Sequence, residues 1–155
     1  MRKGPISGTS DSLSAPVSWL DIETAVTAEL SSEDPEHPFE RALRTDTVGG
    51  WRASDPGPQL IRLRFDIPQS IRHIHLEFRE EEVDRSQEIA LFATSKTSPR
   101  KELVRQQWAF SPHGSNVEIE DFHFDLEGVM TLELVIDPGR DDKQVFASLQ
   151  VIQIG

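Results

Sequence analysis

Two alternating apolar segments between residues 61 and 78 constrain the fold of this chain more than any other feature. In the first segment the apolar residues all fall on odd positions: Ile61, Leu63, Phe65 and Ile67. Charged side chains occupy the positions between them, and this period of two is typical of a half-buried β-strand. The segment Ile74 to Phe78 repeats the pattern after a turn at Pro68-Gln69-Ser70. The two segments are therefore predicted to be neighbouring antiparallel strands with one face against a core.

Similar apolar patterns, separated by turn clusters such as Ser98-Pro99 and Asp137-Pro138-Gly139, predict the other strands. They are expected at residues 20–30, 88–94, 103–110, 116–124, 129–137 and 144–154. In the first of these, Ile22 to Val26 also fits one helical turn, although we favour the strand. A short helix is expected over residues 38–43, because Pro38 suits a first helical turn and Phe39 and Leu43 are four residues apart.

The order of these segments predicts an all-β protein, an antiparallel jelly-roll-type β-sandwich of about eight strands with one short helix. Residues 1–18, rich in Ser, Gly and Pro, are expected to be a flexible leader. Residues 19–155 are expected to form a single domain. Within it, the apolar positions change from odd, at Val117 and Ile119, to even, at Phe122 and Phe124. This change predicts a bulge near Glu120-Asp121.

Charge and composition narrow the classes of partner. The chain of 155 residues has a net charge of -11 and no cysteine. An acidic chain is repelled by phosphate backbones and anionic lipids, so neither nucleic acid nor a membrane is an expected partner. Without cysteine there is no thiolate nucleophile or thiolate metal site. No apolar run approaches the roughly 20 residues that span a bilayer, and the basic start lacks the apolar stretch of a signal peptide, so a cytoplasmic location is expected.

Several short motifs together are similar to those of one known superfamily. They are Ser31-Ser32, Ala42-Leu43 with Asp46-Thr47, Trp51-Arg52-Ala53-Ser54, the two alternating segments, and Ala147 to Val151. These motifs resemble the galactose-binding-domain-like superfamily, also called discoidin or coagulation-factor type C domains, over roughly residues 20–155. The stretch from Leu43 to Ala53 looks most similar to the N-terminal domain of the single-strand-break-repair scaffold. In this resemblance Trp51 matches the usual core tryptophan.

The resemblance implies a non-catalytic binding module whose ligand meets loops at one end of the sandwich. These loops map to residues 31–39 and 79–87, and both are acidic. A sugar needs an apolar platform with a few fixed donors and acceptors. We expect ligand contacts from His37, Arg79, Glu80 and Arg85, and the ligand to be a carbohydrate or, alternatively, a protein in an intracellular assembly. The simpler interpretation is that Phe39 belongs to the core and the charges form a solvated rim.

Calcium is possible in this resemblance but not predicted, and no other cofactor is expected. Calcium-dependent members carry an acidic turn after the Ala-Leu pair and a glutamate near the last strand. Here Arg44 and Thr45 replace the turn, and Ser148 stands near the expected glutamate. Asp46 and Thr47 are most simply a polar turn.

One enzymatic alternative comes from His73, His75 and Glu77, which share a strand face as in the His-x-His plus Glu metal set of cupins. The glycines that frame that set are absent, and His123 is the only other strand histidine. An ordinary exposed strand face is the favoured interpretation. No serine nucleophile elbow and no glycine-rich phosphate loop is found.

Overall fold

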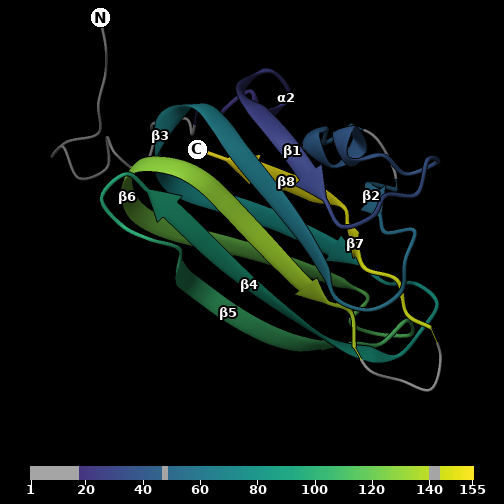
Figure 1. Cartoon of the computed structure of the whole chain (residues 1–155). Helices are drawn as coiled ribbons and strands as arrows, with labels where there is room; N and C mark the ends of the chain where they lie inside the picture. The colour runs from purple at the N-terminus through teal and green to yellow at the C-terminus, as the bar shows by residue number, and fades with distance from the viewer. Residues whose placement is uncertain (1–17, 47–48, 140–143) are drawn as a thin grey trace, which may run out of the picture.

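The computed structural model describes residues 18–46, 49–139 and 144–155, and these residues form the predicted antiparallel β-sandwich (Figure 1). Most of the predicted leader lies outside the described residues. The elements are α2 (Ile22–Ala25), β1 (Val26–Leu30), η1 (Phe39–Leu43), β2 (Trp51–Arg52), β3 (Gln59–Arg79), β4 (Arg85–Ser95), β5 (Lys101–Phe110), β6 (Val117–Asp137), β7 (Ser148–Leu149) and β8 (Val151–Ile154). No helix among the described residues is long and apolar enough to cross a bilayer.

Two long bent strands, β3 and β6, connect the layers of the sandwich. Each is 21 residues long, and they pair with each other along almost their whole length. The N-terminal half of β3 and the C-terminal half of β6 lie in a sheet of order β1-β3-β6-β4-β5. The other halves form a second layer with β8, which pairs with β3 between Ile74 and Glu77. A small separate sheet joins β2 to β7.

The prediction that residues 61–67 and 74–78 form neighbouring strands was wrong. They are the two halves of β3, and each pairs with β6 rather than with the other. The residues between them, around Pro68, form a bend at which the register with β6 shifts repeatedly. Proline lacks a backbone N–H donor and is tolerated where the pairing between strands is irregular. A proline within a sequence can therefore mark either a bend inside one strand or a turn between two strands. Ile67, expected in the core, is 70% exposed at this bend.

The predicted bulge at Glu120-Asp121 was also wrong. The register is continuous from Arg79↔Val117 to His73↔His123, and the shifts lie farther along, between His123 and Thr131. Even positions of β6 face inward in both halves, so Glu118 and Glu120 are the half-buried residues, while Val117 and Ile119 are exposed. The apolar pattern therefore indicates the wrong inward face for residues 117–120. This half of β6 lies at the edge of the sheet, where an inward carboxylate can remain partly hydrated.

The remaining differences are at the chain's ends. The predicted strand over residues 20–30 is a helical turn, Ile22–Ala25, followed by a strand, Val26–Leu30. The predicted strand over residues 144–154 is limited to β7 and β8. The predicted helix near Pro38 is confirmed as the 3-10 helix η1, which buries Phe39 and Ala42. In the core, Trp51 is fully buried as expected, and Trp108 packs on Phe78 with ring centroids 5.1 Å apart.

Candidate functional site

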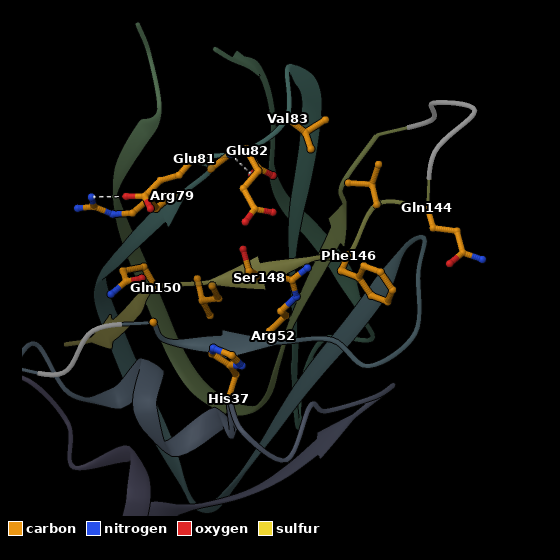
Figure 2. A pocket seen from close by; sticks show the side chains of 14 residues that line it. His37, Arg52, Arg79, Glu81, Glu82, Val83, Gln144, Phe146, Ser148 and Gln150 are labelled. Carbon is orange, nitrogen blue, oxygen red and sulfur yellow. Dashed lines mark hydrogen bonds and ion pairs between the residues drawn. The ribbon is translucent and has the colours of Figure 1, made fainter. Parts of the chain in front are cut away.

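A cavity of about 340 Å³ opens at one end of the sandwich, where the small β2-β7 sheet meets the loop after β3 (Figure 2). Its lining comes from four places in the chain: His37, Gly49 with Arg52, residues 79–83, and residues 144–150 without Ala147. His37, Arg79 and Glu80, three of the four residues predicted to contact a ligand, lie in its wall. The fourth, Arg85, does not.

The backbone of the β2-β7 sheet fixes the floor of the cavity. Arg52 donates its N–H to the carbonyl of His37 at 3.2 Å, and the carbonyl of Arg52 accepts from Asp34 N–H at 2.8 Å. Gly50, with φ +47°, lies so close to the β7 end that an added Cβ would come within 2.2 Å of the carbonyl oxygen of Leu149. Only glycine fits this approach, which brings Arg52 beside Ser148.

The imidazole of His37 is oriented by a contact with the carboxylate of Asp34. Its Nδ1 lies 3.1 Å from a carboxylate oxygen of Asp34, and about a third of its side chain is exposed. A hydrogen bond from Glu36 N–H, followed by the bond to His37, lowers the pKa of Asp34. The carboxylate therefore stays ionised and orients the imidazole, leaving its second ring nitrogen free to meet a ligand.

The Arg52 side chain makes no hydrogen bond or ion pair with a carboxylate within the part of the chain that the structure describes, although its charge helps to lower the pKa of nearby Asp34. Its guanidinium carbon lies 5.4 Å from the centre of the Phe146 ring, and Figure 2 shows both side chains on the cavity wall. An arginine on an aromatic ring keeps its donors in one plane. Arg52 and Phe146 thus combine directed donors with an apolar surface.

Arg85 positions a wall residue and does not line the cavity itself. Its side chain is 3% exposed, and its Nε donates to Glu80 Oε1 at 2.6 Å. Its Nη1 donates to Gln87 and to the carbonyl of Pro138. Although burial acts in the opposite direction, the bonds from Arg85 and from Glu82 N–H lower the pKa of Glu80. Glu80 is therefore a fixed, ionised acceptor.

The upper rim is acidic and more exposed. Arg79 is half exposed and pairs with Glu81 at 3.2 Å, the contact drawn in Figure 2. Glu82 is exposed and makes no side-chain ion pair with a described residue. The rim thus presents carboxylates around a wall that carries Arg52 and His37.

Sequence reasoning missed the wall residues Arg52, Phe146, Ser148 and Gln150. A usable signal was present, because Phe146, Ser148 and Gln150 alternate with the buried residues Ala147, Leu149 and Val151. In the same way Arg52 follows the buried Trp51. A period of two in a short segment predicts which side chains point away from the core.

The histidines of the cupin-like alternative gather on the outer face of the β3-β6 pair, away from the cavity. Asp121 Oδ1 lies 2.8 Å from His73 Nε2 and 2.7 Å from His75 Nδ1, and His75 Nε2 contacts Glu77 at 2.7 Å. His123 stacks on His73. Partial burial opposes the charged imidazole, but the bonds to Glu77 and Asp121 raise the pKa of His75. These contacts direct both ring nitrogens of His75 and Nε2 of His73 to carboxylates, whereas Nδ1 of His73 is buried without a hydrogen-bond partner among the described residues.

No group of three or more His, Asp or Glu residues within residues 18–46, 49–139 and 144–155 is arranged to hold a metal ion. This statement covers Asp46 but not Thr47, which lies outside the described residues.

Comparisons with known proteins identify the fold through structure alone. No family model and no curated protein sequence matches the chain. A pectin-binding carbohydrate-binding module is 21% identical with a TM-score of 0.59, covering 84% of this chain and 90% of its own. The family 32 module from Clostridium perfringens NanJ in complex with galactose is 16% identical, with a TM-score of 0.58 and coverage of 86% and 95%.

A third similar structure is the N-terminal domain of the single-strand break repair protein XRCC1. It is 16% identical, with a TM-score of 0.61 and coverage of 84% of this chain and 97% of that one. Both expected resemblances are thus confirmed at the level of the fold. The chain has the galactose-binding-domain-like, or discoidin-like, fold that carbohydrate-binding modules and the XRCC1 N-terminal domain share.

Proposed function

We propose that this protein is a non-catalytic binding module that holds a carbohydrate in the cavity between the β2-β7 sheet and the loop after β3. The observation that carries the proposal is the combination, in one wall, of the Phe146 ring and Arg52, whose guanidinium donates no hydrogen bond to a described residue. Sugar recognition needs a few fixed polar groups around an apolar surface, and these two side chains supply both. The galactose and pectin modules of the same fold support this substrate class.

The roles of the predicted residues follow from their contacts. His37 is oriented by Asp34, and its ring can donate to or accept from a sugar hydroxyl. Glu80 is oriented by Arg85 and can accept a hydrogen bond from a sugar hydroxyl. Arg79 lies at the rim, where its pairing with Glu81 leaves half of its side chain exposed. Arg85 acts through Glu80 and is a positioning residue.

The lowered pKa of Glu80, a carboxylate in the cavity wall, supports binding without catalysis. Glycoside hydrolysis requires one carboxylic acid with a raised pKa beside a second carboxylate. Glu80 has a lowered pKa because Arg85 and Glu82 N–H stabilise its charge against the effect of burial. Glu81 is paired with Arg79. Glu80 is therefore not suited to donate a proton at neutral pH.

A glycan array followed by titration calorimetry tests the proposal. We expect a galactose- or galacturonate-containing glycan to bind, and Arg52→Met to weaken that binding by about tenfold or more, because a lost charged donor costs about 1.5–3 kcal/mol. Arg44→Met, which removes an exposed arginine outside the cavity, is the matched control. Absence of binding by every glycan, or equal losses in both variants, would contradict the proposal.

Protein binding is the second candidate function for this end of the molecule, and the exposed carboxylates of Glu81 and Glu82 favour it. A charged rim can select a basic partner surface. If the array is silent, cross-linking through these loops followed by mass spectrometry should recover a partner peptide. Recovery of none would leave this candidate without support.

A further inference from the structure

A different surface, away from the cavity, is left open by the N-terminal half of β6. Residues 117–126 pair on one side with β3, from Arg79↔Val117 to Ile71↔Leu126. On the other side β4 pairs with β6 only between Val129 and Asp137. Within the described part of the chain, no strand pairs with that other side of residues 117–126. We call this segment the β6 edge.

The hydrogen-bond alternation identifies which residues of the β6 edge have free backbone groups. Glu80 N–H donates to the carbonyl of Asn116 at 2.8 Å, so the backbone N–H and C=O groups of the even-numbered residues of β6 point toward β3. In agreement, the odd-numbered Glu77 and His73 of β3 bond to Gln150 and Gly155, on the β8 side. The N–H and C=O groups that point outward therefore belong to four exposed residues: Val117, Ile119, Asp121 and His123.

The side chains of the β6 edge protect it against some strands and not against others. Natural edge strands are commonly blocked by lysine, by proline, by a covering segment or by inward-pointing charges. Glu118 and Glu120 are inward-pointing charges, and they disfavour an apolar or acidic strand but not a basic one. The sequence from Val117 to Leu126 contains no lysine, arginine, proline or glycine. Ile119 is 54% exposed and Val117 is 38% exposed. An apolar side chain flanked by free backbone donors and acceptors is a favourable template for another strand.

The charges of the edge indicate the kind of strand that fits. Asp121 is bonded to His73 and His75, and Asp125 lies 3.4 Å from Arg72. Glu118 and Glu120 have no cation among the described residues and are hydrogen-bonded to each other. Partial burial and the neighbouring Glu118 raise the pKa of Glu120 to about 7. This like-charge pair is the one place on the edge where a cation is missing.

We propose that the β6 edge binds an extended segment of a partner protein as an added strand, with lysine or arginine opposite Glu118 and Glu120 and apolar residues beside Ile119. Because side chains alternate along a strand, the segment would alternate basic and apolar residues. A second copy of this chain does not fit, since pairing two such edges would bring four glutamates together in a protein of net charge -11.

The proposal is tested with the isotope-labelled protein and a short capped peptide that alternates lysine with valine. We expect the amides of Val117, Ile119, Asp121 and His123 to exchange about tenfold more slowly with the peptide bound. The even-numbered amides, already bonded to β3, should change little. A peptide alternating glutamate with valine, and a lysine-valine peptide with N-methylated valines, should both give no protection.

Matched variants separate strand addition from general attraction between opposite charges. Ile119→Pro removes an outward N–H without removing a bond to β3, which an edge strand tolerates, and should abolish the protection. Glu118→Gln with Glu120→Gln should weaken binding about tenfold, measured at pH 8, above the Glu120 pKa of about 7. Glu36→Gln with Glu40→Gln removes two carboxylates at exposed positions away from the edge and should not weaken it. Equal effects of both pairs, or peptide shifts spread over the acidic surface without amide protection, would overturn the proposal. Dimerisation of the protein alone through these amides would assign the edge to a second copy instead.

Discussion

The two halves of β6 contain glutamates in opposite circumstances. In the C-terminal half, which is central in its sheet, Glu133 is buried and receives Arg62 Nε at 2.8 Å and Arg100 Nε at 2.5 Å. In the N-terminal half, at an edge, Glu118 and Glu120 have each other and no cation among the described residues. On one strand, therefore, a glutamate is paired with arginines where strands lie on both sides of β6. It has no cationic partner where one side of β6 is unpaired.

The pKa values reflect this difference. Burial opposes the charge of Glu133, but the bonds from Arg100 and Arg62 lower its pKa. For Glu120 burial and Glu118 act together, and the pKa rises to about 7. A partly buried carboxylate without a cationic partner is tolerated in the free protein only because water still reaches it. A cation supplied by a binding partner would stabilise its charged form. The contrast thus separates a structural glutamate from one available for recognition.

The largest effect is expected from Glu133→Ala. Removing this carboxylate leaves Arg62 and Arg100 facing each other, and the free energy of unfolding should fall by about 2 kcal/mol, less than for a fully buried pair because both arginines are partly exposed. Urea denaturation measures it. A loss below about 0.5 kcal/mol would mean that this half of β6 does not depend on compensation.

Glu120→Gln should have a smaller effect of opposite sign. Because the folded pKa of about 7 lies above the ordinary value of 4.5, the unfolded state ionises first, and the native protein loses stability as the pH rises between these two values. The variant removes that loss and should be more stable than the parent by about 1 kcal/mol near pH 8, after allowance for solvent screening. Denaturation midpoints across this range should converge at low pH. A variant less stable at high pH would refute the assignment.

On the outer face of the same half, Asp121→Asn should lower the pKa of His75, measured by NMR titration. The hydrogen bond to Asp121 is one of the two that raise this pKa. A raised histidine pKa stabilises the fold at pH below the unfolded value, and the contribution disappears as the pH rises through the folded value. The variant should therefore lose stability mainly in acid. An unchanged His75 titration would show that Glu77 alone holds the imidazolium.

Ile119→Thr should change stability least, by under about 0.5 kcal/mol, because its side chain is half exposed and threonine suits strands. The same variant should reduce binding of the lysine-valine peptide only a few-fold, since the backbone groups remain. Thermal unfolding and peptide titration give the two values. A large loss of stability would mean that Ile119 packs on a neighbour and is not available to a partner.

The sequence indicated the fold class well because period-two patterns report which face of a strand is buried. They do not report which strands pair, and so a bend at Pro68 was interpreted as a turn between neighbours. The same patterns assume that an inward position is apolar. At the β6 edge that assumption fails, because inward Glu118 and Glu120 stay partly hydrated while Val117 and Ile119 point outward.

The superfamily resemblance pointed to two loops that contribute to the wall of the cavity, but it did not indicate the rest of that wall. His37, Arg79 and Glu80 lie in the wall because they belong to the two loops that the resemblance identified. Arg52 and Phe146 come from segments that are far apart in the sequence and meet through the β2-β7 pair. Arg85 lies outside the wall, because its side chain is buried by its partners Glu80 and Gln87, which the sequence does not reveal.

The pairing of β2 with β7 has a kinetic consequence. Trp51 pairs with Leu149, so the floor of the cavity joins segments that are far apart in the sequence. By contrast β4 and β5 are adjacent in sequence and pair directly. Local pairs close cheaply, whereas distant ones must first overcome a large loop-closure entropy. Folding should therefore begin at β4-β5 and finish at the cavity, so that binding competence is acquired last and marks the completed fold.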